Sequence, residues 1–202
     1  QAERMDDESV EAGLIYHTAA YRIRTVQLDH RTPVLAYAFE PQARMKIIPE
    51  RLKQLGLEPG PWLSDLKAGY QTGEITQMIE LPNGEQQTVA TLAQQLLQRV
   101  AGDKLVYATD LADTASNRER LIGLAQGAHS LFCEACFAAA DHQRALSNGH
   151  LTTTACGEIA AAARVKQLVP FHFSPRYQGE PQRLFDEIES ALQQNPDTRL
   201  IK

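Results

Sequence analysis

The chain has 202 residues, of which 43% are hydrophobic, enough for one sizeable α/β domain with its own core. Its formal net charge of -5 excludes a chain that is basic throughout, although its 20 Lys and Arg residues can still form a local patch for nucleic acid. No run of about eighteen apolar residues and no charged-then-apolar leader is present, so the sequence predicts neither a membrane span nor a signal peptide, and we expect a cytoplasmic protein.

The chain begins QAERMDDESV, an acidic stretch without a clear structural pattern that starts with glutamine. We expect the natural start of the protein to be missing, although a processed or tagged terminus would look the same. If residues have been lost before Gln1, a functional site is only partly represented in this sequence.

Three antiparallel strands are predicted first, because β-branched and aromatic residues cluster in Leu14–His17, Tyr21–Leu28 and Val34–Phe39. An excursion from the sheet follows. Pro49 can open a short helix that Gly56 closes, and a rigid Pro-Gly-Pro turn at 59–61 precedes a second helix. A hairpin is then expected at Asn83-Gly84, followed by one helix over 89–102 with Gly102 as its stop.

From Lys104 onward, strand-like and helix-like runs alternate, which indicates layers of helices on a sheet. We interpret Cys133, Cys136 and Cys156 as buried free thiols in a reducing compartment. The strands are expected at 104–110, 130–137 and 167–174, and the helices at 115–128, 140–149, 153–165 and 180–194.

Four polar residues stand at the ends of these runs: His30, Asp110, His150 and His172. Strand ends on one edge of a sheet are where α/β proteins assemble ligand and metal sites. Neutral imidazoles and a carboxylate suit zinc, and a carboxylate can bridge two such ions. Zinc lowers the pKa of its water toward 7, so this set of residues indicates hydrolysis.

Each of these residues also has a simpler interpretation. His30 can be a surface or hydrogen-bonded histidine, and Asp110 can serve as a turn or helix-cap residue. His172 lies between Phe171 and Phe173, so its imidazole is desolvated and needs a partner, which a packed core can also supply.

Six segments in order resemble motifs of the C-terminal part of ribonuclease Z, a family of metallo-β-lactamase-fold endonucleases that trim the 3′ end of precursor tRNA. The resemblance covers roughly Gly13 to Gly179. It implies an α/β metallo-β-lactamase fold, an αββα sandwich in which 1–202 is part of a single domain, a homodimer, and one or two zinc ions, with manganese or iron as alternatives. The segments are LDHRTPVLAYAFEP, GLEPGPWLSDLKAG, LVYATD, LFCEACF, GHLTT and FHFSPRY.

The resemblance also implies roles for the four strand-end residues. His30 and His172 match metal ligands, Asp110 matches the aspartate that bridges two zinc ions, and His150 matches the catalytic histidine that donates a proton. Three residues of the segment FHFSPRY are expected to contact the substrate: Arg176 as a phosphate clamp, with Ser174 and Tyr177 beside it.

Gly60 and Pro61 resemble the Gly-Pro motif of the arm with which ribonuclease Z grips tRNA. We therefore expect a protruding substrate-binding arm at 42–70. The basic residues Arg51, Lys53 and Lys67 are either phosphate contacts on this arm or simply a solvated helix face.

The sequence also departs from the family pattern. The family's early H-x-H-x-D-H motif has no match here, so we expect half of a binuclear site and an inactive chain when it is alone. Thr109 and Leu111 flank Asp110 where the family commonly has Gly-Asp-Thr, which leaves the local hydrogen bonding open. Two alternatives to precursor tRNA processing are a hydrolase of a small phosphodiester or other ester, and a non-catalytic binding fragment or subunit.

Overall fold

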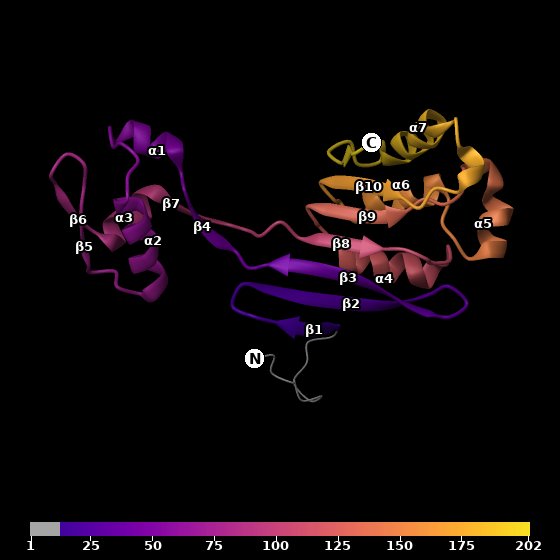
Figure 1. The fold of residues 1–202 in the computed structure, drawn as a ribbon, viewed down its shortest axis with the longest axis horizontal. Coiled ribbons are helices and arrows are strands. Elements are labelled where there is room, and N and C mark those ends of the chain that lie inside the picture. Colours follow the sequence, from indigo (N-terminus) through magenta and orange to yellow (C-terminus); the bar gives the residue numbers. More distant parts are fainter. Residues whose placement is uncertain (1–12) are drawn as a thin grey trace. The chain divides into compact units, whose positions relative to one another are not determined.

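The computed structural model describes residues 13–202, which divide into two compact units (Figure 1). Residues 13–42 and 103–202 form the first unit, and Ala43–Gly102 form the second. The expected arm at 42–70 covers only the first part of this second unit.

A mixed sheet of seven strands is the centre of the first unit, with the order β1-β2-β3-β8-β9-β10-β11. The pairs from β1 to β8 are antiparallel, which confirms the three predicted N-terminal strands, and the pairs from β8 to β11 are parallel. The strands are β1 (Leu14–His17), β2 (Tyr21–Asp29), β3 (Pro33–Pro41), β8 (Leu105–Ala108), β9 (Ser130–Glu134), β10 (Gln167–Phe171) and β11 (Arg199–Leu200).

Helices α4 (Ala115–Ala125), α6 (Thr153–Ala162) and α7 (Pro181–Leu192) pack on one face of this sheet. The small buried residues of α6 allow close packing: a Cβ added at Gly157 would lie 2.7 Å from the Cβ of Ala191 in α7. The helices and the covered face share one core, which includes Leu131, Ile159 and Ile188.

The opposite face of the sheet carries apolar side chains that are open to solvent. Leu35, Tyr37 and Phe39 alternate along β3 with the buried Ala36 and Ala38, as a two-residue period requires. Tyr37 pairs with Tyr107 and Phe39 pairs with Leu105 on β8, so the apolar rows continue across strands. The result is a single sheet with helices on one side and aromatic residues exposed on the other.

The second unit combines three helices with two small sheets, β4-β7 and β5-β6. The helix expected over 89–102 is half wrong: α3 ends at Leu96, and Leu97–Val100 form strand β7, which pairs with β4. Cross-strand pairing outweighs the helical propensity of this Leu- and Gln-rich run. The elements are β4 (Arg44–Ile47), α1 (Pro49–Gln54), α2 (Trp62–Thr72), β5 (Met78–Glu80), β6 (Gln86–Thr88), α3 (Val89–Leu96) and β7 (Leu97–Val100).

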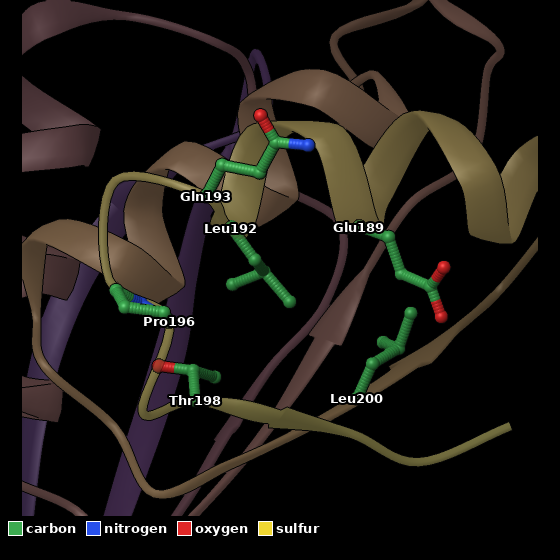
Figure 2. A pocket seen from close by; sticks show the side chains of 6 residues that line it. All are labelled: Glu189, Leu192, Gln193, Pro196, Thr198 and Leu200. Carbon is green, nitrogen blue, oxygen red and sulfur yellow. The ribbon is translucent and has the colours of Figure 1, made fainter.

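Three short helices complete the first unit: η1 (Ala139–Asp141), α5 (His142–Asn148) and η2 (Pro175–Tyr177). A hollow of about 240 Å³ lies between α7 and β11, lined by residues such as Glu189 and Leu192 (Figure 2). Because β11 pairs with Gln167 and Leu168, at the start of β10, this hollow is not at the strand ends where the polar residues gather. Among the described residues, the helices are too short or too polar to cross a membrane.

Candidate metal and catalytic site

The carboxyl ends of the parallel strands β8, β9 and β10 bring the site together. Asp110 comes two residues after the end of β8, Glu134 is the last residue of β9, and His172 follows β10 directly. His150 lies between α5 and α6, two residues before Thr152, whose hydroxyl caps α6 by accepting from the backbone N–H of Ala155. Parallel topology therefore delivers Asp110, Glu134 and His172 to one edge of the sheet, and the loop before α6 adds His150.

The backbone at Asp110 and His172 is unusual, because both residues have positive φ angles, 54° and 60°. Side chains other than glycine rarely adopt this left-handed conformation, which costs of order 1–3 kcal/mol. Such strain concentrates at functional sites, and here it falls on two of the predicted metal ligands.

Glu134 holds the site together, although its side chain has no exposed surface. Its Oε1 accepts from the backbone N–H groups of Leu151 at 2.9 Å and Leu111 at 3.4 Å. Its Oε2 accepts from the backbone N–H of Asp110 at 3.1 Å. The Nδ1 atoms of His150 and His172 lie 2.9 Å and 3.1 Å from the same Oε2. One buried carboxylate therefore fixes the segments that carry the other site residues.

These contacts set the orientation of three imidazoles. Because Glu134 is an acceptor, His150 and His172 donate through Nδ1 and keep Nε2 for other partners. His30 behaves in the same way, since its Nδ1 lies 2.7 Å from the carbonyl oxygen of Gly149. This close approach needs glycine: a Cβ at Gly149, which has a φ of 76°, would lie 3.1 Å from that ring nitrogen.

Three of the four predicted residues, Asp110, His150 and His172, lie in one cluster with Glu134. Ligand atoms of Asp110, Glu134, His150 and His172 lie within 4.8 Å of one another. His30 stands next to this group, with its ring centroid 4.6 Å from that of His150, which in turn is 5.3 Å from that of His172. The structure thus brings the predicted residues together, and their individual roles stay predictions.

The donor set fits a metal ion. The carboxylate of Asp110 and the imidazole of His172 are both open, with side chains 44% and 41% exposed, and Nε2 of His172 is the ring nitrogen left for a metal because Nδ1 donates to Glu134. Histidines whose Nδ1 is held by a protein acceptor are the usual arrangement around metals. Glu134 fits poorly as a ligand, since both its oxygens are already occupied by donors of the protein.

Thr109 and Leu111, the neighbours that depart from the family pattern, are accommodated by hydrogen bonds. The hydroxyl of Thr109 lies 3.4 Å from Oδ2 of Asp110 and 3.4 Å from Nδ1 of His172. Leu111 is fully buried, and its N–H donates to Glu134. The unusual neighbours thus leave Asp110 anchored.

Arg176, Ser174 and Tyr177 follow His172 in the same loop, but they differ in what they can offer a substrate. The guanidinium of Arg176 is partly exposed. Ser174 donates its backbone N–H to the carbonyl of Cys136. Tyr177 is buried, and its hydroxyl donates to Asp141 and accepts from the N–H of Ala138. These contacts favour a structural role for Tyr177 over the substrate contact that we expected.

The cysteines are buried free thiols, as predicted. Burial is the main cause that raises the pKa of Cys136 to about 11, and the negative charges of Glu134 and Asp110 add to it. The contact with Cys156, more than burial, raises the pKa of Cys133. Neutral thiols of this kind are poor nucleophiles and poor metal ligands.

Gly60 and Pro61, the expected arm residues, belong to the second unit. They line a hollow of about 610 Å³ whose charged lining residues, Glu58, Asp65 and Glu80, are all acidic. Acidic walls repel phosphate, so this hollow does not favour a phosphate contact at Gly60 and Pro61.

Sequence reasoning missed Glu134 as a site residue: its segment LFCEACF was expected to be a strand and resembled a family motif, but the glutamate was given no role. The signal was present: a charged residue within a buried strand needs partners, and none is adjacent in the sequence. Its partners come from three other segments, 110–111, 150–151 and the residue His172, which no local pattern shows.

Comparisons with known proteins show what the chain is similar to. The chain is 38% identical over 165 residues to "Ribonuclease Z" of Deinococcus radiodurans, covering 82% of the chain and 48% of that relative. It is 33% identical over 195 residues to "Ribonuclease Z" of Crocosphaera subtropica, covering 96% of the chain and 58% of that relative. No protein-family model matches the chain.

Among solved structures, the metallo-β-lactamase fold protein YhfI from Bacillus subtilis is similar, with a TM-score of 0.52 and 14% sequence identity. The match covers 94% of the chain and 49% of that protein. Because the sequence identity is low, the match shows the fold alone. The chain spans about half the length of the curated relatives it matches. Over the part that it spans, the chain is a homologue of ribonuclease Z with a metallo-β-lactamase fold.

Proposed function

We propose that this chain supplies part of the active site of a metal-dependent phosphodiester hydrolase that processes the 3′ end of precursor tRNA. The observation that carries the proposal is the cluster around Glu134, which joins Asp110, His150 and His172 at the carboxyl ends of parallel strands. Similarity to relatives named Ribonuclease Z supports the choice of substrate.

In this proposal Asp110 and His172 hold a metal ion, and His30 contributes its free Nε2 from the adjacent position. Zinc is the preferred ion, since imidazole and carboxylate suit it, with manganese or iron as alternatives. A bound zinc ion supplies Lewis acidity, which stabilises negative charge on phosphate oxygens and makes water more acidic. The remaining ligands are proposed to come from outside the 202 residues.

His150 is proposed to move the proton. Its Nδ1 is held by Glu134 whether the ring is neutral or protonated, so Nε2 is the atom that gives up a proton. The leaving alkoxide of a cleaved phosphodiester needs such a proton. Glu134 fixes the plane of the imidazole and compensates its positive charge when both nitrogens carry hydrogen.

Arg176 is proposed to bind a phosphate next to His150. The guanidinium lies 5.6 Å from the ring centroid of Phe137, and the ring of Phe137 is 6.1 Å from that of His150. A planar guanidinium can contact two phosphate oxygens at once. Ser174, two residues before Arg176, is proposed to line the same rim.

A small phosphodiester is the second candidate substrate, and the acidic hollow at Gly60 and Pro61 favours it over a tRNA gripped at that point. The expected homodimer, the cytoplasmic location and the arm at 42–70 stay proposals with the function.

The test is an assay of the longest product of the gene that contains this chain, loaded with zinc. It is given a precursor tRNA with a 3′ trailer and, separately, the chromogenic diester bis(p-nitrophenyl) phosphate. We expect cleavage of both, with a far higher kcat/KM for the tRNA. Comparable values for the two would favour the small-substrate alternative. No cleavage of either, with metal bound, would favour a non-catalytic binding subunit and overturn the proposal.

A further inference from the structure

Asp141 connects the two loops that follow β9 and β10. The hydroxyl of Tyr177 donates to its Oδ2 at 2.5 Å, and Nη1 of Arg176 lies 3.6 Å from its Oδ1. The two oxygens of the Asp141 carboxylate thus contact two neighbouring residues of η2, Arg176 and Tyr177.

Asp141 is itself held in place. Its backbone N–H donates to the carbonyl of Ala138 at 2.9 Å, and the N–H of Ala138 donates to the hydroxyl of Tyr177 at 3.0 Å. Tyr177 packs in a small apolar cluster with Ala138 and Leu184. These contacts fix Asp141 and Tyr177, and the two residues form a rigid support for the side chain of Arg176, which is long and flexible by itself.

Arg176 rests on this support. Its guanidinium carbon lies 5.6 Å from the ring centroid of Phe137 and 6.0 Å from that of Tyr177. The ion pair with Asp141 is longer than a hydrogen bond and the side chain is 35% exposed, so donors remain for another anion. Without Asp141, the rings of Phe137 and Tyr177 alone would not fix the direction in which the guanidinium of Arg176 points.

We propose that Asp141 is a positioning residue, which holds the guanidinium of Arg176 over Phe137 so that its free donors meet a phosphate beside His150. The inference rests on the proposed function for the identity of that anion. Ordering a free arginine side chain costs about as much as a tenfold change in affinity, so a preordered Arg176 binds phosphate more tightly. The repulsion between Asp141 and the phosphate acts in the opposite direction, but solvent screens it at this exposed pair.

The first test measures the order of Arg176 directly and needs no catalysis. The ¹⁵N relaxation of the arginine Nε–H groups is recorded in the 202-residue chain, with the Arg176 signal assigned by its loss in Arg176→Lys. We expect Asp141→Asn, whose amide oxygen still accepts from Tyr177, to make the Arg176 Nε–H mobile. Asp113→Asn is the matched control, since Asp113 pairs with Arg118 elsewhere: it should loosen Arg118 and leave Arg176 ordered. An Arg176 that stays ordered in Asp141→Asn overturns the proposal.

The second test is a double-mutant cycle in which the binding of inorganic phosphate is measured. Phosphate is titrated into the chain and followed by the backbone amide shifts of the loop 172–178. Asp141→Asn should weaken binding about five- to tenfold, whereas Asp141→Asn in the Arg176→Lys background should weaken it no further. Equal losses in both backgrounds would show that Asp141 acts only on the fold and would overturn the proposal.

Tyr177→Phe provides a second variant, because it frees Asp141 without removing its charge. We expect partial mobility of Arg176 and a smaller loss of phosphate binding. Full mobility of Arg176 with unchanged phosphate binding would contradict the link between order and affinity. Failure of the proposed function is separate: it would appear as absent phosphodiester cleavage with the coupling between Asp141 and Arg176 intact.

Discussion

The Nδ1 atom of His150 lies 2.9 Å from Oε2 of Glu134, a carboxyl group whose side chain has no exposed surface. The same group accepts hydrogen bonds from the backbone N–H groups of Asp110, Leu111 and Leu151. The contact that orients the predicted catalytic histidine is therefore also a contact on which the fold depends.

Glu134→Gln should lower the free energy of unfolding by about 3–5 kcal/mol. The amide keeps one acceptor oxygen but turns an NH₂ group toward donors that had been satisfied. Urea unfolding followed by circular dichroism measures the change. The matched control is Glu158→Gln, with a side chain 37% exposed and paired with Arg118, which should cost within about 1 kcal/mol. Equal effects of the two substitutions would contradict the central role of Glu134.

His150→Ala and His172→Ala should separate proton transfer from metal binding in the metal-loaded enzyme. His150→Ala should keep its metal and lower turnover by about 10²- to 10⁴-fold, because a general acid is lost. His172→Ala should lose metal, because an open ligand at the strand end is removed. Elemental analysis with kinetics on the same samples decides the matter. The reverse pattern would exchange the two roles, and unchanged cleavage in both would remove the hydrolase function.

The sequence predicted the strand ends well because each strand is a local pattern and parallel topology gathers their carboxyl ends. His30, after the antiparallel strand β2, and His150, between α5 and α6, were indicated by residue type and by the family resemblance, whereas Asp110 and His172 could be found in this way. Glu134 could not, since what makes it central is a set of donors from distant segments. The strand Leu97–Val100 was missed for a related reason. Its partner, Arg44–Ile47, lies at the other end of the second unit in sequence, and the pairing between the two strands overrides a local helical pattern.

The substrate loop shows the same limit. The segment FHFSPRY indicated Arg176 and Tyr177 together as substrate contacts. Only the structure separates them, because the hydroxyl of Tyr177 is used by Asp141 and Ala138. A side chain's partners depend on burial, which the segment alone does not determine.

Stability should fall at alkaline pH through Cys136. Burial raises the pKa of its thiol in the folded chain to about 11, from an ordinary value near 9.0. The folded state therefore disfavours the thiolate, so this contribution is complete below about pH 9 and is lost as the pH rises toward 11. Denaturant unfolding of the metal-free chain at several pH values should show this decline, less steep in Cys136→Ser. Identical slopes in the two proteins would contradict it.

The open face of the large sheet should behave as an interaction surface, because exposed aromatic rows of this kind are uncommon on isolated proteins. Tyr37 and Tyr107 pair directly across β3 and β8, and are 41% and 43% exposed. Tyr107→Ser should cost only about 0.2–1 kcal/mol of stability, the range for a lost cross-strand pair, while reducing both the binding of an apolar dye such as ANS and self-association in sedimentation. Leu131→Ala, on the covered face of the neighbouring strand, should instead cost about 2–5 kcal/mol and leave dye binding at the open face unchanged in the folded state. Equal destabilisation by Tyr107→Ser and Leu131→Ala would mean that the aromatic face is already covered in solution. Unchanged dye binding in Tyr107→Ser would mean that the dye binds an apolar surface other than this face.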